Sequence, residues 1–313
     1  MCDPCAHRAV LRAVKALAKS PAARCIDPDA AMPWLPFTAD GQRIRTKALD
    51  EPLRDVEARE LRRYIDALRE VVGPRVSELE AVARDWKGTP EGLVERIRSM
   101  ATGMRTDMAS QIAEIARPYA AVMADAGARA ALATLPAIPA VNELVDFGQA
   151  NPLAVQAAAR SADRMAQVVS QHMAERVAGA VATGVEQGLS IPQIADAIAE
   201  QGFSDERATM IARTESAYAY SEGRIEAWKE TGVVQGKQWL LSPDACEFCE
   251  AAAAQFSENA IGLDDDFYAQ GTVLTGTDGG RMTLSYRSVN APPLHPNCRC
   301  DTTAALDPRL FEE

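Results

Sequence analysis

The residues best suited to chemistry are four cysteines and one histidine near the C-terminus. Cys246 and Cys249 form a CxxC pair in SPDACEFCE, and His295 and Cys298 form an HxxC pair in APPLHPNCRC. Two thiolates from one tight turn can bind a tetrahedral ion at about 2.3 Å, and a second pair from a distant segment can complete four ligands. The spacing therefore predicts a structural zinc site made by these four side chains. Cys300 is a spare donor that could replace one of them.

Other interpretations of these residues stay open, namely free buried cysteines or a redox or catalytic thiol, such as a Cys249–His295 nucleophilic pair. A catalytic zinc ion normally has three protein ligands, an open water position and a general base beside it. Five donors can instead close the shell, and the HxE motif that precedes PCxxC in nucleotide deaminases is missing. The sequence thus favours a protein that is not an enzyme. The rival hypotheses are a metal-dependent nuclease or protease and a DNA-binding zinc module.

A second group of donors lies close to the N-terminus. It consists of Cys2, Cys5, His7 and Cys25, which include another CxxC pair. These side chains are enough for a second tetrahedral site, and the alternative is free thiols at a frayed chain end. The grouping of all seven cysteines near the two ends favours metal ligands over disulfides in a reducing compartment.

The charge balance limits the classes of partner. The 313 residues carry a net charge of −11, and residues 232–313 contain five basic side chains against twelve acidic ones. General nucleic-acid binding rests on neutralising phosphates, so this balance argues against a DNA coat. No apolar run reaches the roughly 18 residues that span a bilayer, and the first residues lack the features of a signal peptide. We therefore expect a protein that is cytosolic when made and has no membrane partner.

Apolar residues recur with helical spacing over most of the chain, and proline, glycine and capping residues divide the pattern into segments. The predicted helices cover 51–72, a further run that begins at Pro74, 90–118, 152–187, 191–200 and 205–231. The expected N-caps are Thr89, Asn151, Ser190 and Ser204. Glycines that end a helix are expected at Gly188 and Gly232.

The pattern changes after Gly232. The run GKQWLL (236–241) predicts a strand, and TVLTGTDGGRMTLSY (272–286) predicts a hairpin around a Gly/Asp turn. The predicted fold class is therefore mainly α, with a helical N-terminal region (1–140) followed by an α+β domain (141–313). In that second domain, helices run to about residue 231, and a metal-bound β module with a small hairpin and a structural zinc knuckle follows from 232.

Three segments together resemble a known family. The runs IARTESAYAYSEG, DACEFC and PPLHPNCRC, which lie between about residues 190 and 303, are similar to the C-terminal domain of phage minor head proteins of the Mu F-like or SPP1 head-morphogenesis family. The resemblance implies a minor capsid protein of the phage head interior, made in the host cytoplasm, that joins the procapsid with the portal. It implies a role in head assembly or in DNA packaging and delivery. The implied partners are the portal, the major capsid or scaffold protein, and packaged DNA.

Within the first of these runs, Arg213 and Glu215 match recurring helix residues of the family. One interpretation is an exposed charge pair, worth about 0.5 kcal/mol or less. The other is that one of the two side chains packs into the metal module and joins the helix to the knuckle.

Overall fold

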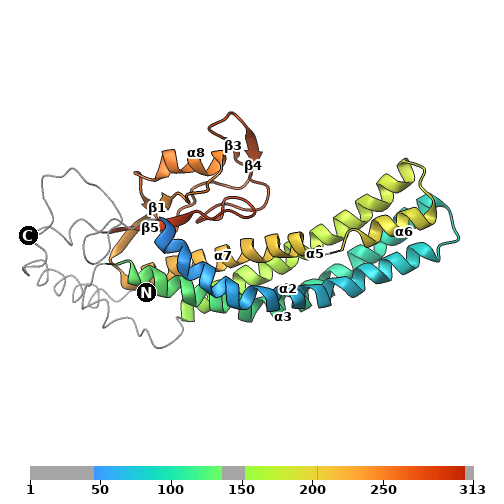
Figure 1. Ribbon diagram of the computed structural model, residues 1–313, viewed down its shortest axis with the longest axis horizontal. Helices are drawn as coiled ribbons and strands as arrows, with labels where there is room; N and C mark the ends of the chain where they lie inside the picture. The colour runs from blue at the N-terminus through green and yellow to red at the C-terminus, as the bar shows by residue number, and fades with distance from the viewer. Residues whose placement is uncertain (1–45, 136–151, 203, 307–313) are drawn as a thin grey trace, which may run out of the picture. The chain divides into compact units, whose positions relative to one another are not determined.

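The computed structural model describes residues 46–135, 152–202 and 204–306. These residues fold mainly into helices, followed by a small antiparallel sheet, which confirms the predicted fold class (Figure 1). The chain forms two compact units. The helical unit contains Glu57–Ala121 and Ala158–Glu215, and the mixed unit contains the remainder, including Val122–Ala157 and the chain from Ser216 onward.

Some predictions lie outside the described residues. The N-terminal donors Cys2, Cys5, His7 and Cys25 precede residue 46, and the cap Asn151 and the predicted domain boundary near residue 140 fall within 136–151. These therefore stay predictions.

Five long or medium helices begin and end as follows: α2 is Thr46–Arg84, α3 is Pro90–Ala133, α5 is Pro152–Glu186, α6 is Ile191–Ala199 and α7 is Asp205–Thr231. None of the helices in the described ranges has the length and hydropathy that a bilayer crossing requires. The predicted starts are confirmed by hydrogen bonds, because the hydroxyl oxygens of Thr89 and Ser204 accept from backbone N–H groups three residues on. Gly188 and Gly232 end their helices with positive φ angles of 69° and 64°.

The predicted breaks at two prolines are wrong. Pro74 lies inside α2 and Pro118 lies inside α3, although proline removes one helical hydrogen bond. Both prolines are exposed, so the carbonyl groups that lose their partners can turn toward water. The buried neighbours Val72, Val76 and Tyr119 hold the flanking turns in place.

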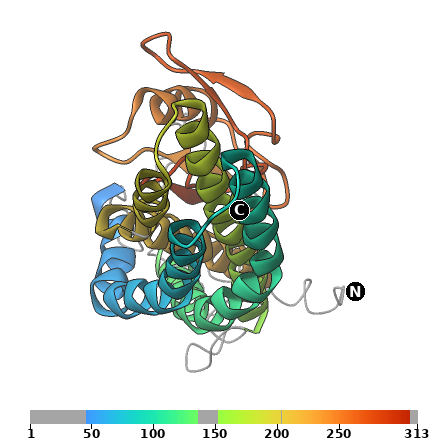
Figure 2. The same cartoon turned by 90° about the vertical axis from the view of Figure 1, so that its right-hand side faces the viewer.

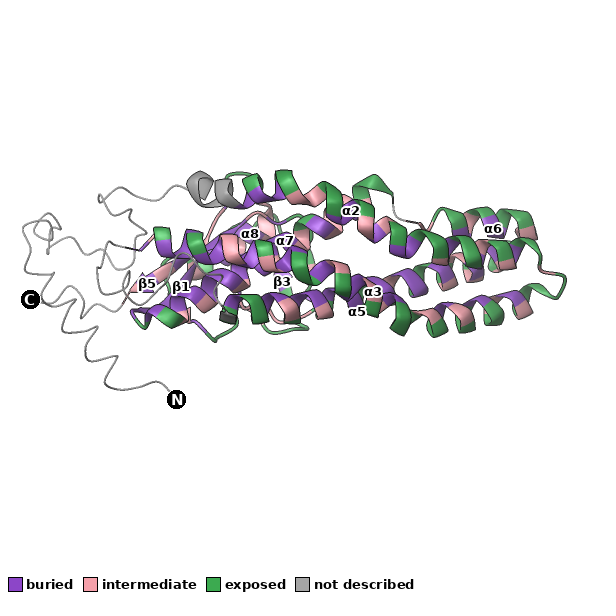
Figure 3. Ribbon diagram, turned by 90° about the horizontal axis from the view of Figure 1, so that it is seen from below, coloured by how far each residue is buried: buried purple, intermediate pink, exposed green. Residues whose placement is uncertain are grey.

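The core of the helical unit is built from aliphatic side chains on one face of each helix. Segments of α2, α3 and α5 lie side by side (Figures 2 and 3), and buried residues recur along each of them (Figure 3). The rings of Tyr64 and Tyr119 stack with their centroids 4.2 Å apart. Other side chains with no exposed surface are Leu68, Leu79, Leu93, Ile97, Ile112, Met173 and Val177. Each such side chain stabilises the unit by about 1.5 to 3 kcal/mol relative to exposure.

Two helices of the mixed unit approach so closely that only glycine fits at their contact. A Cβ on Gly127 of α3 would overlap the carbonyl oxygen of Tyr220 in α7, and a Cβ on Gly223 would overlap that of Ala124. The Trp228 Nε1–H donates to the carbonyl of Ala131 at 3.4 Å beside this crossing. The missing side chains therefore fix the distance between these two helices.

The C-terminal module, residues 234–306, contains the sheet. Strand β1 (Val234–Leu240) pairs in antiparallel fashion with β2 (Ile261–Gly262) on one edge and β5 (Asp301–Leu306) on the other. The predicted strand and hairpin are confirmed as β1 and as β3 (Val273–Thr275) with β4 (Arg281–Thr283). The helix α8 (Glu247–Phe256) and strand β5 were not predicted.

Candidate metal centre

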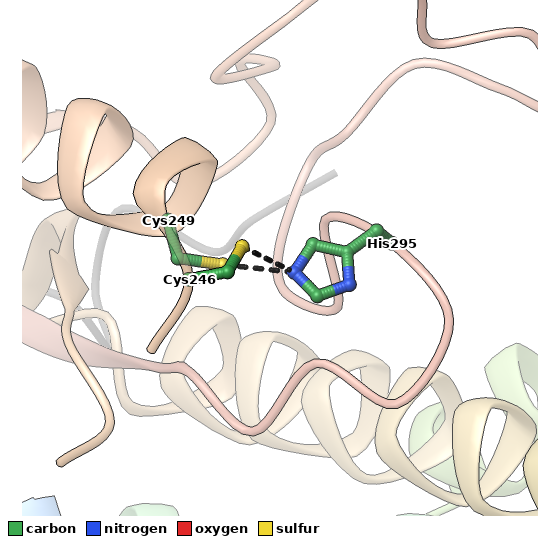
Figure 4. Close-up of side chains that lie close together, drawn as sticks. All are labelled: Cys246, Cys249 and His295. Atoms are coloured by element: carbon green, nitrogen blue, oxygen red, sulfur yellow. Dashed lines mark hydrogen bonds between the residues drawn. The ribbon is translucent and has the colours of Figure 1, made fainter. Parts of the chain in front are cut away.

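The start of α8 positions the CxxC pair. Cys246 is the N-cap residue, with the extended backbone angles φ −85° and ψ 170°, and Cys249 lies in the first helical turn. Residues three apart lie on the same face of a helix, so both sulfur atoms point toward His295 (Figure 4). The helix end also presents its positive dipole to the two sulfur atoms.

The HPNCRC segment forms a tight turn that returns the second pair of donors. The Cys298 N–H donates to the carbonyl of His295 at 3.1 Å, and Asn297 occupies the left-handed region with a φ of 61°. Asparagine tolerates this region better than most residues. Asp301, the first residue of β5, is paired with Leu240 at the end of β1. This pairing therefore brings the end of β1, which precedes the CxxC pair, next to the start of β5, which follows Cys300.

The five predicted donors meet at one place. The His295 Nε2 lies 3.1 Å from the Cys246 Sγ and 3.3 Å from the Cys249 Sγ, and the Sγ atoms of Cys249 and Cys298 are 3.5 Å apart. The donors form two sets of three, with the ligand atoms of each set within 4.8 Å of one another. One set is Cys246, Cys249 and His295, and the other is Cys249, Cys298 and Cys300. Cys249 belongs to both.

This donor set can hold a metal ion. Bonds of about 2.0 to 2.3 Å at tetrahedral angles separate neighbouring ligand atoms by roughly 3.3 to 3.8 Å, close to the separations found here. Thiolate and imidazole donors suit zinc and other soft or borderline metals. The structure thus brings the five predicted side chains into two sets of three that share Cys249, and each set offers ligands for such an ion, while the choice among them stays a prediction.

A hydrogen bond sets the tautomer of the histidine. The His295 Nδ1 lies 2.8 Å from the Pro296 carbonyl oxygen. A carbonyl can only accept, so the proton is on Nδ1 and the lone pair of Nε2 faces the sulfur atoms. Second-shell contacts of this kind fix ring orientation in metal sites.

The buried sulfurs share negative charge. Hydrogen bonds to Cys298 and Cys300, together with burial, raise the pKa of Cys249. The hydrogen bond with Cys249 is the largest cause that holds the pKa of Cys298 well below the usual thiol value. One thiolate is therefore stabilised by its neighbouring thiols, and complete deprotonation of the cluster requires a cation among them.

The donors form part of a small apolar core. Trp239 and Phe267 meet edge to face with centroids 5.2 Å apart, and Cys249, Cys298 and Leu294 pack in the same cluster. Strand β1 also places Lys237, which is fully buried, inside the module. Its ammonium group donates to the carbonyls of Leu263 at 2.6 Å and Asp265 at 2.7 Å. Burial is the main reason that the pKa of Lys237 is lowered to about 8.

A charged residue of α7 that the sequence analysis did not single out joins the module. Arg213 is exposed, whereas Arg224 is fully buried and its Nη2 donates to the Thr302 carbonyl at 3.0 Å. Arg224 is four residues from both Tyr220 and Trp228, which places it on the apolar face of the helix. This spacing in the sequence could have indicated that Arg224 is buried.

Comparison with known proteins gives a match to a protein family over the part of the chain that contains the donors. No curated protein and no solved structure matches the chain. Residues 175–303 match the family described as Phage Mu protein F like protein. The matched segment runs from α5 through the whole cysteine and histidine cluster into β5. The resemblance to Mu F-like phage head proteins is therefore confirmed for residues 175–303.

Proposed function

We propose that this chain is a minor head protein of a phage, which joins the procapsid with the portal and acts in head assembly or in DNA packaging and delivery. The single observation that carries the proposal is the family match over 175–303, the segment that contains the folded C-terminal module. In this proposal, residues 1–140 form the region that faces the portal or shell, and residues 141–313 form the head-protein domain. Its partners are the portal and the major capsid or scaffold protein.

The proposal includes a structural zinc ion in the C-terminal module. Cys246, Cys249, His295 and Cys298 would hold it, with Cys300 as the replacement donor. Zinc would supply a fixed cross-link between the start of α8 and the turn that precedes β5. The chain contributes the orientation of each donor: the helix presents two sulfurs, and the carbonyl of Pro296 orients the imidazole.

The donor chemistry supports an assembly role more than an enzymatic one. Sulfur-rich sites with four protein ligands are typical of structural zinc, whereas catalytic zinc keeps one position for water. Here two sets of three donors share Cys249, and one set consists of the buried Cys249, Cys298 and Cys300. The acidic surroundings of the module also disfavour a DNA-binding zinc module, because phosphate contacts need basic side chains.

The test is co-expression with the portal protein of the same phage, followed by a pull-down. We expect the wild-type chain to retain the portal, and His295→Ala to reduce retention if the module supports the interface. Tyr286→Ala is the matched control, because Tyr286 is an exposed residue of the same module that is not a donor.

The enzyme hypothesis is tested on the same preparations. Nuclease and protease assays with added zinc, magnesium or manganese should give no turnover above a blank. Turnover that His295→Ala abolishes in a folded protein, together with no portal retention, would replace the assembly role with a metal-dependent enzyme.

A further inference from the structure

Helix α7 carries a buried arginine that faces the start of the last strand. The side chain of Arg224 has no exposed surface, and its guanidinium lies 4.9 Å from the ring centroid of Trp228. Its Nη2 donates to the Thr302 carbonyl, and its Nε is 3.4 Å from an oxygen of Asp301. Neither Nε nor Nη1 makes a hydrogen bond. The charge therefore depends on the Asp301 carboxylate and the Thr302 carbonyl.

The charge of Arg224 is balanced only when the first residues of β5, Asp301 and Thr302, are in place. The same oxygen of Asp301 accepts a hydrogen bond from the Thr302 N–H at 2.7 Å, which fixes the carboxylate at the strand end. A buried ion pair is strongly destabilising when one partner is removed, because the other charge stays in a low-dielectric environment. Displacing the start of β5 would thus leave Arg224 buried without its partner.

The first residues of β5 are also the continuation of the donor segment. Asp301 directly follows Cys300 and is three residues from Cys298. We propose that Arg224 is a positioning residue for the metal centre, since it holds the start of β5 and with it the sulfurs of Cys298 and Cys300. This inference rests on the metal site proposed above. Coupling is reciprocal, so removal of the metal should loosen the part of α7 that surrounds Arg224.

An arginine of the module that also contacts α7 provides a matched control. The Arg287 guanidinium lies 3.5 Å from the ring centroid of Tyr218 and its Nη1 is 3.5 Å from an oxygen of Glu222, so it also contacts α7. It is eight residues before His295 and does not adjoin a donor. If the coupling depends on contact with β5, replacement of Arg287 should leave the metal affinity almost unchanged.

The experiment measures zinc affinity of the full-length chain by competition with a chromogenic chelator. The comparison uses wild type, Arg224→Met, Arg224→Lys and Arg287→Met, each checked for helix content by circular dichroism. Loss of a residue that orients a metal ligand typically weakens metal binding 10- to 100-fold; Arg224 acts on the donors through β5, so we expect the lower end, about a tenfold loss, for Arg224→Met. We expect Arg224→Lys to recover part of that loss and Arg287→Met to stay within about twofold of wild type.

Hydrogen exchange gives an independent measurement that uses only the wild-type protein, so it does not require any variant to fold. Chelation should increase exchange in the part of α7 that contains Arg224, with no matching change in α2. Equal zinc affinity of wild type and folded Arg224→Met, or unchanged exchange in α7 on chelation, would overturn the role of Arg224 and leave the metal site intact. A wild-type chain that binds no zinc would overturn the metal site and this inference together.

Discussion

The helical unit and the C-terminal module reach their folds by different physical means. The helical unit buries long faces of α2, α3 and α5, with aliphatic side chains that touch across the helices. The C-terminal module has strands of only two to seven residues, and cysteine side chains take up part of its core. Short strands bury little apolar area, so the module must gain stability from another source.

The difference teaches where the source of stability can be recognised from a sequence pattern and where it depends on contacts between distant residues. Regular spacing of apolar residues is sufficient to define a helix packed on other helices. The module instead combines a cluster of cysteine and histidine donors that can hold a metal ion with a buried ammonium group that bridges two carbonyls. Changes in the two regions should therefore have separate effects, and the four predictions below test that separation.

The largest effect is expected from loss of the shared donor. Cys249→Ser removes a ligand from both sets of three, and structural zinc can supply about 10 to 16 kcal/mol of apparent binding energy. We expect loss of zinc and of ordered structure in the C-terminal module, with helix content of the helical unit retained. Elemental analysis and hydrogen exchange measure the two results.

Cys300→Ser is the control for this change, and we expect it to keep zinc because four other donors remain. Both variants should be made in a background that lacks the N-terminal thiols, namely with Cys2, Cys5 and Cys25 changed to serine. Zinc retained at one ion per chain by Cys249→Ser would contradict the assignment of that side chain.

A cavity made in the helical unit should destabilise that unit and leave the C-terminal module unaffected. Leu93 of α3 has no exposed surface, and leucine-to-alanine changes in such positions cost about 2 to 5 kcal/mol. Leu93→Ala should lower the thermal stability of the helical unit and leave zinc affinity unchanged. Glu95→Ala, at an exposed position of the same helix, is the control and should change stability by less than about 0.5 kcal/mol. A large loss of zinc affinity in Leu93→Ala would break the separation.

The buried lysine predicts a pH dependence of the module. The pKa of Lys237 is lowered to about 8, mainly by burial and secondly by the charge of Lys229, while three acidic neighbours partly oppose these effects. Between pH 8 and the ordinary lysine value, the unfolded chain binds more protons than the folded one, so stability rises with pH in that window. The expected gain is about 2 to 3 kcal/mol from pH 7 to pH 10, relative to Lys237→Met.

Denaturant unfolding of the zinc-loaded protein at several pH values measures that gain. Subtracting the Lys237→Met profile removes the contribution of groups that titrate in both proteins. Parallel profiles for the two proteins would show that Lys237 does not change its protonation state on folding.

The smallest expected effect concerns the glycine crossing of the mixed unit. In Gly127→Ala the new methyl group would overlap a backbone carbonyl, which must move, and such overpacking costs about 1 to 3 kcal/mol. Gly179→Ala in α5 is the control, because nothing lies within 4 Å of its Cβ position. We expect that control to stabilise its helix by about 0.5 to 1 kcal/mol. Thermal unfolding should therefore move in opposite directions for the two variants.

Sequence reasoning found the elements whose signals are local. The capping residues Thr89, Ser190 and Ser204 marked helix starts that the structure confirms, and the Gly/Asp turn marked the hairpin. The prolines at positions 74 and 118 misled it, because a local rule gives no weight to the packing that keeps a helix continuous. The alanine run of α8 also carried a helical signal, which the CxxC motif obscured.

Elements that depend on distant partners could not be found in this way. Strand β5 is short, and its partner β1 is far away in the sequence, so only pairing defines it. The five candidate donors were predicted from spacing and residue type, since the chemistry of a tetrahedral site restricts both. Lys237 gave no comparable signal, because its partners are backbone carbonyls that every sequence possesses.

The pairing of Leu240 with Asp301 also has a consequence for the length of the chain between them. Because the entering and leaving strands lie next to each other, residues 241–300 form an excursion whose two ends share one base. Insertions with adjacent ends are tolerated in folds, since the host chain need not change its path to accept them. The strand pairing itself therefore does not set the length of the excursion, and a two-residue turn would join β1 to β5 in its smallest form.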